Sequence, residues 1–514
     1  MLAQVERIRL RISKGTDPKK KSQLGQFFTP ASVAMFMAKL FTANGGECRL
    51  LDAGAGIGSL SSAFLDRCIG KEINFSRVHL LAYELDETIH GELRGILEKY
   101  ESVLPFSFEV IPNDFLEAAV NGIQFNQFRF THAILNPPYK KINSRSRHRL
   151  LLRQVGIETV NLYSAFIALS LLLLESGGQL AAIVPRSFCN GPYYRPFREF
   201  LMGNAAIRHI HLFESRTEAF KDDKVLQENI IILLERGVRQ HSVNVSISRD
   251  DSFDDIDAIE YPFDRIVFPD DPEKFIHVPT APGISEIEIS RSVNSTLSEL
   301  GIKVSTGPVV DFRASKHLCK MPEADTVPLL YPAHFRDNRT AWPNAKIKKP
   351  NAIKLNQDTQ KWLYNNGYYC VVRRFSSKEE KRRITASVVE PSSFKGAPFI
   401  GFENHLNVFH RNKKGLPKTL AYGLAVYLNT TALDSFIRRF NGHTQVNATD
   451  LKTIKYPCLK RLNRLGEWAI SQGNLDQKSI DDIFGKADHE KEEKEHRGRK
   501  TNHSVVRFAE GAAK

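Results

Sequence analysis

Short apolar runs alternate with longer helical segments through the first 240 residues, and this alternation constrains the fold more than any other feature. Polar, glycine-rich or proline-rich stretches follow several of these runs. Seven runs predict strands, at residues 49–52, 79–83, 108–111, 132–135, 179–184, 209–213 and 229–234. The pattern predicts an α/β domain with a doubly wound, Rossmann-like sheet of seven strands, whose ligands bind beyond the carboxyl ends of the strands.

The first predicted strand ends in a glycine-rich turn, residues 51–58, which includes Asp52, Gly54 and Gly56. Glycines let the backbone come close to a ligand, and the Asp52 carboxylate stands beside them. The spacing is Gly-x-Gly-x-Gly, whereas a dinucleotide-binding turn has Gly-x-Gly-x-x-Gly. The turn therefore predicts a nucleotide-like ligand, with a dinucleotide as the alternative.

The next two predicted strands also end in residues suited to such a ligand. Glu84 follows the second strand and is positioned to bind a ribose diol. Asp114 and Phe115 follow the third strand and could hold an adenine ring by its amino group and its face. We expect these residues and the glycine-rich turn to share one edge of the sheet.

The tetrapeptide Asn136-Pro137-Pro138-Tyr139 follows the fourth predicted strand. An Asn side-chain carbonyl and a backbone carbonyl can both accept from an exocyclic amine, and the Tyr139 ring can stack on the plane that carries the amine. The prolines fix φ and remove backbone donors, so the Pro137 carbonyl is free to face a cleft. The alternative is a strand that ends in a proline-rich turn, with Tyr139 as a packing residue. With the glycine-rich turn, the tetrapeptide predicts methyl transfer to a planar amine.

Charge divides the chain near residue 300. Residues 241–300 contain 4 Lys and Arg against 13 Asp and Glu, whereas residues 301–460 contain 27 against 11. A basic segment interleaved with aromatic residues suits a polyanion, and Arg373 and Arg374 are our candidates for DNA contact. We expect a catalytic domain at 1–240, an acidic connecting segment at 241–300, a basic domain at 301–465 and a charged, flexible tail at 466–514.

The apolar runs, the amino terminus and the cysteines bear on where the protein acts and on what it binds. No apolar run reaches the ~20 residues of a membrane span, and the amino terminus lacks the apolar core of a signal peptide. We expect a cytoplasmic protein without a membrane partner. The six cysteines include no Cys-x-x-Cys pair, so we expect neither a metal site nor a disulfide framework.

In this order the motifs resemble those of γ-class N6-adenine DNA methyltransferases of type II restriction-modification systems, the TaqI-like and PstI-like enzymes. Residues 25–30 resemble the family's motif ten, in which the position of Thr29 contacts the methionine end of S-adenosylmethionine. Residues 52–58, 84–85, 114–115 and 136–139 resemble its motifs one to four. The aromatic residue that usually grips the other face of the target base cannot be assigned, and Phe220 is only a candidate.

The resemblance implies a class I methyltransferase domain followed by an α+β target-recognition domain. It implies S-adenosylmethionine as cofactor, double-stranded DNA as partner, and transfer to N6 of a flipped-out adenine. It also implies protection of that DNA from a cognate restriction endonuclease, and a PstI-like target, CTGCAG.

Four alternatives remain open. Cytosine-N4 and protein-glutamine methyltransferases use similar tetrapeptides, although Ser is commoner than Asn in the former and the latter resemble shorter chains. A fused nuclease would need a carboxylate cluster, for which Asp358, Glu379 and Lys381 are the best residues. A DNA-binding protein without activity is disfavoured because every expected cofactor residue is present.

Overall fold

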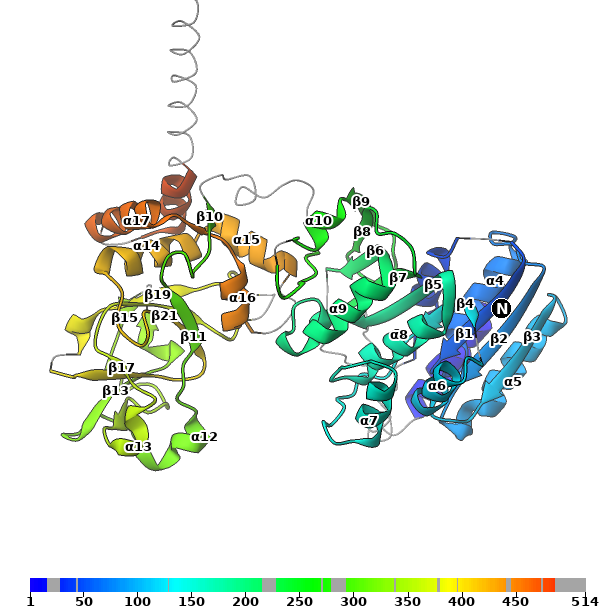
Figure 1. Cartoon of the computed structure of the whole chain (residues 1–514), viewed down its shortest axis with the longest axis horizontal. Coiled ribbons are helices and arrows are strands. Elements are labelled where there is room, and N and C mark those ends of the chain that lie inside the picture. Colours follow the sequence, from blue (N-terminus) through cyan, green and yellow to red (C-terminus); the bar gives the residue numbers. More distant parts are fainter. Residues whose placement is uncertain are drawn as a thin grey trace, which may run out of the picture. The chain divides into compact units, whose positions relative to one another are not determined.

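The protein is described from a computed structural model, which covers residues 1–15, 28–42, 45–127, 129–214, 228–269, 271–278, 293–336, 339–376, 380–394, 396–440, 445–472 and 475–485. The chain divides into two compact units, Met1–Pro282 and Gly283–Lys514, each with its own sheets (Figure 1). None of the described helices is long and apolar enough to cross a membrane.

A nine-stranded sheet forms the centre of unit 1, in the order β3-β2-β1-β4-β5-β7-β6-β8-β9. The first five strands in this order are parallel, and β7 is antiparallel to both β5 and β6. The strands are β1 Glu47–Ala53, β2 Arg77–Tyr83, β3 Phe106–Ile111, β4 Phe130–Leu135, β5 Leu174–Pro185, β6 Ala205–Phe213, β7 Asn229–Arg236, β8 Val243–Ser248 and β9 Asp257–Tyr261.

Helices cover both faces of this sheet. Leu50 packs in one buried cluster and its neighbour Leu51 in another, because successive side chains of a strand point to opposite faces. The first cluster contains residues of α1 Leu2–Gly15, α3 Ala31–Lys39, α4 Ser59–Ile69 and α5 His90–Glu101. The second contains residues of α6 Phe115–Gln124, α7 Arg147–Gln154, α8 Leu162–Leu173 and α9 Arg195–Asn204. The expected doubly wound class is confirmed, with two strands more than the seven predicted.

The two additional strands correct the predicted boundary at residue 240. β8 and β9 lie within the expected acidic connecting segment, yet they extend the sheet of unit 1, and the short helix α10 Phe263–Ile266 follows them. Val243 and Val245 of β8 are buried, whereas β9 is an edge strand that presents Asp257 and Glu260 to solvent. An edge strand tolerates such charges, so a high acidic content did not exclude a strand here.

Unit 2 contains two larger sheets and a small one. The six-stranded sheet has the order β11-β21-β18-β19-β15-β14, formed by Lys303–Thr306, Leu406–His410, Tyr369–Arg373, Ala386–Val389, Arg339–Thr340 and Phe335–Arg336. The five-stranded sheet has the order β12-β16-β13-β20-β17, formed by Leu318–Cys319, Ala352–Lys354, Thr326–Leu330, Phe399–Phe402 and Tyr364–Asn365. The small sheet pairs β10 Val293–Ser295 with β22 Tyr456–Pro457. With the helices below, unit 2 is an α+β structure, as expected.

Two helices of unit 2, α14 Lys418–Leu428 and α17 Leu459–Gln472, lie in direct backbone contact. A methyl group added at Gly423 would fall 1.8 Å from the Leu462 carbonyl oxygen, and one at Gly466 would fall 1.8 Å from that of Thr419. The other helices are α12 Asp311–Ala314, α13 Gln357–Gln360, α15 Thr431–Phe440 and α16 Ala448–Thr453. Only glycine permits this contact between α14 and α17.

Helix α17 also corrects the predicted start of the tail at residue 466. Leu465 and Ala469 are buried, and so are Ile480 and Phe484 in the short helical stretch that follows. The apolar residues recur at helical spacing among charged neighbours, and the high charge concealed this pattern. Residues 486–514, the rest of the expected tail, lie outside the described residues.

Candidate active site

A cleft that encloses about 790 Å³, part of it open to solvent, lies at the carboxyl edge of the sheet in unit 1. Six of the predicted site residues line it: Thr29, Gly54, Gly56, Glu84, Phe115 and Asn136. They follow β1, β2, β3 and β4 or precede α3, so parallel strands bring residues from distant parts of the sequence to one edge. Asp52, Asp114, Pro137 and Tyr139 do not line the cleft.

Glu84 is fixed against the glycine-rich turn. The Gly56 N–H donates to Glu84 Oε2 and the Asp86 N–H donates to Oε1, each at 2.8 Å. Gly56 adopts a φ of +58°, which favours glycine, and a methyl group there would lie 3.3 Å from the Phe28 ring. Burial raises the pKa of Glu84 above its ordinary value. Each carboxylate oxygen retains a lone pair, so the side chain can accept from both hydroxyls of a ribose.

Asp52 lies beneath the turn and is fully buried. Ser61 Oγ donates to Asp52 Oδ2 at 2.5 Å, while Oδ1 has no hydrogen-bond partner among the described residues. Burial raises the pKa of Asp52 from 3.8 to about 7, despite the hydrogen bond from Ser61. Asp52 therefore supports the turn from below and does not form part of the cleft wall.

The tetrapeptide at residues 136–139, which the sequence predicts to be catalytic, begins where β4 ends. Asn136 Nδ2 donates to Thr29 Oγ1 at 3.0 Å, and the Tyr139 hydroxyl lies 3.4 Å from Asn136 Oδ1. The same hydroxyl donates to the Ile183 carbonyl at 3.2 Å, and the Tyr139 ring meets Tyr163 edge to face at 6.2 Å. Pro137 is buried. The Asn136 amide and the Tyr139 ring are thus held in fixed orientations.

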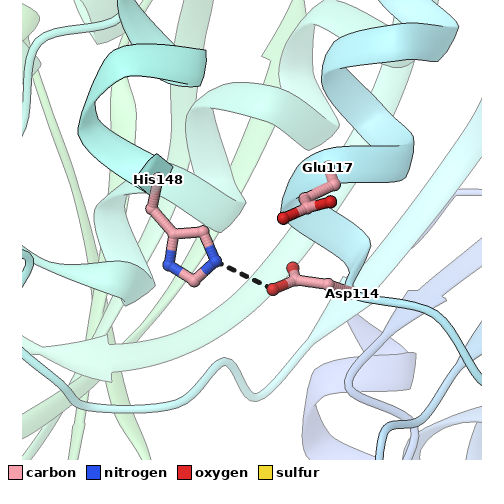
Figure 2. Close-up of side chains that lie close together, drawn as sticks. All are labelled: Asp114, Glu117 and His148. Atoms are coloured by element: carbon pink, nitrogen blue, oxygen red, sulfur yellow. Dashed lines mark hydrogen bonds and ion pairs between the residues drawn. The ribbon is translucent and has the colours of Figure 1, made fainter. Parts of the chain in front are cut away.

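Asp114, which we expected to contact an adenine ring, is hydrogen-bonded to other residues of the protein. It caps α6, since Oδ1 accepts from the Leu116 N–H at 2.8 Å, and its Oδ2 lies 2.9 Å from His148 Nε2 (Figure 2). Glu117 is close by and pairs with Arg147. A metal could bind to the three side chains of Asp114, Glu117 and His148. The pairs Asp114–His148 and Glu117–Arg147 instead join α6 to α7, and this contact is a sufficient reason for the cluster. Asn113 and Phe115, the neighbours of Asp114, line the cleft.

The sequence did not single out several apolar residues of the cleft. Phe28, Ile57, Leu85 and Phe166 all line it. Phe28, Ile57 and Leu85 lie within the stretches that resemble motifs ten, one and two, which was a usable signal. Phe166 lies within an apolar helix that resembles any core helix. Phe220, the candidate second aromatic, lies outside the described residues.

Arg373 and Arg374, the predicted DNA contacts in unit 2, both have protein partners. Arg373 pairs with Glu380, and its side chain is 36% exposed. Arg374 donates to the Asn404 carbonyl at 3.2 Å and to Gln445 Oε1 at 3.0 Å. Arg374 therefore joins two loops. Of the nuclease candidates, Asp358 lies in the first turn of α13, and Glu379 is outside the described residues.

Comparison with known proteins agrees with this geometry. Residues 80–220 match the family described as Eco57I restriction-modification methylase. The type II methyltransferase M.BsuBI of Bacillus subtilis is 53% identical over 472 residues, which cover 90% of this chain and 93% of that protein. The type II methyltransferase M.PstI of Providencia stuartii is 40% identical and covers 94% of this chain and 96% of that protein. The chain belongs to the type II DNA methyltransferases.

This type II methyltransferase also resembles a solved structure over most of its length. A cryo-EM structure of a DrdV–DNA complex superposes with a TM-score of 0.52 at 11% identity, covering 91% of this chain and 59% of that one. At this identity the likeness concerns the fold alone.

Type II DNA methyltransferases use S-adenosylmethionine as cofactor, and the cleft of this chain fits it. A side chain at Gly56 would crowd the Phe28 ring at 3.3 Å, and Glu84 would offer a carboxylate to the ribose diol of the cofactor. Phe115 and Ile57 offer apolar surface to an adenine ring. The protein is thus a site-specific DNA methyltransferase dependent on S-adenosylmethionine.

Proposed function

We propose that this enzyme transfers a methyl group to N6 of an adenine that is rotated out of double-stranded DNA. The observation that carries the proposal is the orientation of Asn136. Its Nδ2 is occupied by Thr29 Oγ1, which directs Oδ1 to the side where it can accept from an exocyclic amine. The Asn136 backbone lies beside the glycine-rich turn, since its carbonyl oxygen is 3.9 Å from a methyl group added at Gly54.

Cofactor and base occupy defined positions in this proposal. Glu84 binds the ribose hydroxyls and Phe115 packs against the adenine of the cofactor. Thr29 lies at the methionine end, and Asp52 maintains the turn. Asp114 still has lone pairs for the amino group of the cofactor's adenine, because a carboxylate has about four and the described contacts use two. The bound cofactor supplies an electrophilic methyl group on a sulfonium centre.

The protein residues then activate the target nitrogen. Rotating a base out of the duplex costs a few kcal/mol, and stacking on Tyr139 returns about 1–3 kcal/mol. Asn136 Oδ1 and the Pro137 carbonyl accept from the two N6 hydrogens and direct the nitrogen lone pair at the methyl group. An Asn amide cannot remove a proton at neutral pH, so the carbon–nitrogen bond forms as the carbon–sulfur bond breaks. The acidified amine then loses its proton to solvent.

The decisive experiment identifies the methylated base. The purified enzyme is incubated with DNA and cofactor carrying a deuterated methyl group, and the digested nucleosides are separated by mass. Labelled N6-methyladenine supports the proposal, whereas labelled N4-methylcytosine replaces it with the cytosine alternative. Asn136→Ala is expected to abolish incorporation while the cofactor affinity, measured by calorimetry, stays within about a few fold.

Unit 2 carries the sequence choice in this proposal. Its basic composition suits a DNA backbone, and Arg373 is the better of the two predicted contacts because its guanidinium is partly exposed. CTGCAG is the candidate target. Incorporation into a duplex with one CTGCAG site is compared with incorporation into a duplex in which one base pair of the site is exchanged. Equal incorporation into both would reject this target.

The biological role that we propose is protection from a cognate restriction endonuclease that cuts the same site. Plasmid DNA from cells that produce the enzyme is expected to resist an endonuclease that recognises CTGCAG. Plasmid from cells that produce Asn136→Ala is expected to be cut. Cleavage of both plasmids would contradict this role.

A further inference from the structure

The segment directly after the catalytic tetrapeptide is held rigidly against unit 1. The Ile142 N–H donates to the Val160 carbonyl at 2.9 Å, and the Leu162 N–H donates to the Lys140 carbonyl at 2.8 Å. Lys141 and Asn161 form an antiparallel bridge between these bonds. The segment therefore has a fixed path away from Tyr139.

This segment and α7 are rich in positive charge. From 140 to 153 there are six Lys and Arg residues and no Asp or Glu. The neighbouring acidic groups are already paired: Glu117 with Arg147, Asp114 with His148, and Glu158 with both Arg149 and Arg153. Lys141 and Arg145 are exposed and have no acidic partner within the described part of the chain.

An exposed aromatic residue lies on the neighbouring loop. Tyr193 follows β5 and is 76% exposed, although it is a large ring on a folded unit. The next residue, Tyr194, stacks on Tyr163 at 5.8 Å, and Tyr163 in turn contacts Tyr139. β4 and β5 are parallel neighbours, so the loops after them leave the sheet at the same edge.

Asn161 connects the two loops. Its backbone forms the bridge with Lys141, and its Nδ2 donates to the Tyr194 hydroxyl at 3.3 Å. Two cations and an exposed ring thus lie on loops that are joined to each other and to the catalytic Tyr139. Phosphate groups bind such cations, and nucleic acid bases stack on such rings.

We propose that Lys141, Arg145 and Tyr193 form a DNA-contacting surface of unit 1, which we term the strand-holding surface. It binds the strand that carries the target base, Lys141 and Arg145 through phosphates and Tyr193 by stacking on a base. This inference rests on the proposed function, since it assumes that one base of that strand enters the cleft beside Tyr139. The strand-holding surface anchors the DNA backbone next to the base that enters the cleft.

The charge contribution is tested with a matched pair of double variants. Lys141→Ala/Arg145→Ala removes one Lys and one Arg from the strand-holding surface. Arg77→Ala/Lys99→Ala removes the same charge from exposed positions at the start of β2 and the end of α5, on the opposite edge of the sheet. DNA affinity is measured over a series of salt concentrations, and cofactor affinity is measured in parallel.

The first double variant is expected to reduce the slope of log K against log salt by about 0.9 for each lost phosphate contact, so by about 1.8. The control is expected to keep the wild-type slope, and both variants are expected to bind S-adenosylmethionine as the wild type does. If Lys141→Ala/Arg145→Ala shows the same salt slope as the control and an unchanged cofactor affinity, Lys141 and Arg145 do not bind phosphates and this part of the proposal is wrong.

The stacking contribution is tested with Tyr193→Ala, Tyr193→Phe and Phe125→Ala. Phe125 is 70% exposed at the end of α6, near the opposite edge, and controls for loss of a surface ring. Loss of one stacked base is expected to weaken DNA binding about 5- to 150-fold in Tyr193→Ala. Tyr193→Phe and Phe125→Ala are expected to retain wild-type binding. Unchanged binding by Tyr193→Ala overturns the stacking part.

The wild-type enzyme in the same experiments separates this inference from the proposed function. If the wild type labels a base other than adenine, the proposed function fails, while the salt slopes still report on the strand-holding surface. If the wild type produces N6-methyladenine and all variants bind DNA as it does, the strand-holding surface is wrong and the proposed function stands.

Discussion

Asn136 Nδ2 and Thr29 Oγ1 form a hydrogen bond of 3.0 Å between residues that lie 107 positions apart in the sequence. The bond joins the tetrapeptide at residues 136–139 to the start of α3. Thr29 is expected to contact the cofactor and Asn136 the target base, so the bond links the two expected binding positions. In the proposed function, Thr29 therefore aligns the cofactor with the target base.

Thr29→Val is therefore expected to lower kcat. It keeps the shape of the side chain but removes the acceptor for Asn136, so the amide loses its fixed orientation. An unmet buried donor costs about 1–3 kcal/mol, which corresponds to a decrease of about 5- to 150-fold. Thr29→Ser keeps the acceptor and serves as the control. Single-turnover methyl transfer measures the effect, and equal rates for Val and Ser would contradict it.

Glu84→Gln is expected to raise the KM for S-adenosylmethionine before it changes kcat. The Gln amide would present an N–H₂ group to one of the two N–H donors, from Gly56 or Asp86, that now face the carboxylate. We expect an increase of at least about tenfold, since hydrogen bonds to a charged group are worth about 1.5–3 kcal/mol. The exposed neighbour Glu87, changed to Gln, is the matched control. A KM equal to that of this control would exclude Glu84 as the ribose ligand.

Asp52 gives the protein without cofactor a defined pH dependence of stability. Its pKa is about 7 in the fold against 3.8 for the ordinary group, so the folded state binds the proton more tightly than the unfolded state. The stabilisation is complete below pH of about 4 and is lost as pH rises to about 7, by up to about 4 kcal/mol. Asp52→Asn removes this dependence.

Thermal unfolding of wild type and Asp52→Asn between pH 5 and 8 measures this difference. The Tm of the variant relative to the wild type is expected to rise across this interval and to level off above it. Parallel pH profiles for the two proteins would show that Asp52 does not titrate in this range.

The two arginines of unit 2 are expected to behave differently. Arg374→Ala leaves the Asn404 carbonyl and the Gln445 side chain without their donor, which should destabilise unit 2 by about 1–3 kcal/mol. Arg373→Ala breaks a partly exposed ion pair, which is worth about 0–1 kcal/mol. Calorimetric unfolding compares the two variants. Equal losses of stability would contradict the structural role of Arg374.

A fragment that ends at Pro282 is expected to bind S-adenosylmethionine but to lose site-specific methylation. It contains all nine strands of the catalytic sheet, whereas a fragment ending at residue 240 would lack β8 and β9. The shorter fragment exposes the edge of β6 and is expected to aggregate. If the longer fragment methylated CTGCAG with full selectivity, unit 2 would not be the part that recognises the DNA sequence.

The sequence predicted those strands whose apolar residues follow one another along the chain because both faces of the strand are buried. The carboxyl-terminal parts of β1, β4 and β5 are buried on both faces, so each strand contains a short apolar run, at residues 50–51, 133–135 and 180–184. The cleft residues at their ends could be predicted because the order of parallel strands brings their carboxyl ends to one edge. Gly56 and Glu84 were found in this way, although their direct hydrogen bond was not.

The features that the sequence did not reveal depend on distant partners. The edge strand β9 contains Asp257 and Glu260 and has no apolar run. Arg374 stands beside Phe375 in a basic stretch that suits DNA, but its partner Gln445 is 71 residues away. The same holds for Asp114 and His148. A charged residue in the sequence is expected to have a polar partner, but the sequence does not show whether that partner is DNA or a distant residue of the same chain.

The contact between Gly423 and Gly466 has a consequence for the evolution of specificity. Any side chain at either position would push α14 and α17 apart, whichever DNA sequence the enzyme reads. If unit 2 reads the DNA, as we propose, mutations that create a new specificity must arise elsewhere in unit 2, on surfaces that can vary without separating this helix pair. Libraries intended to retarget the enzyme should leave both glycines untouched and randomise exposed loop residues instead.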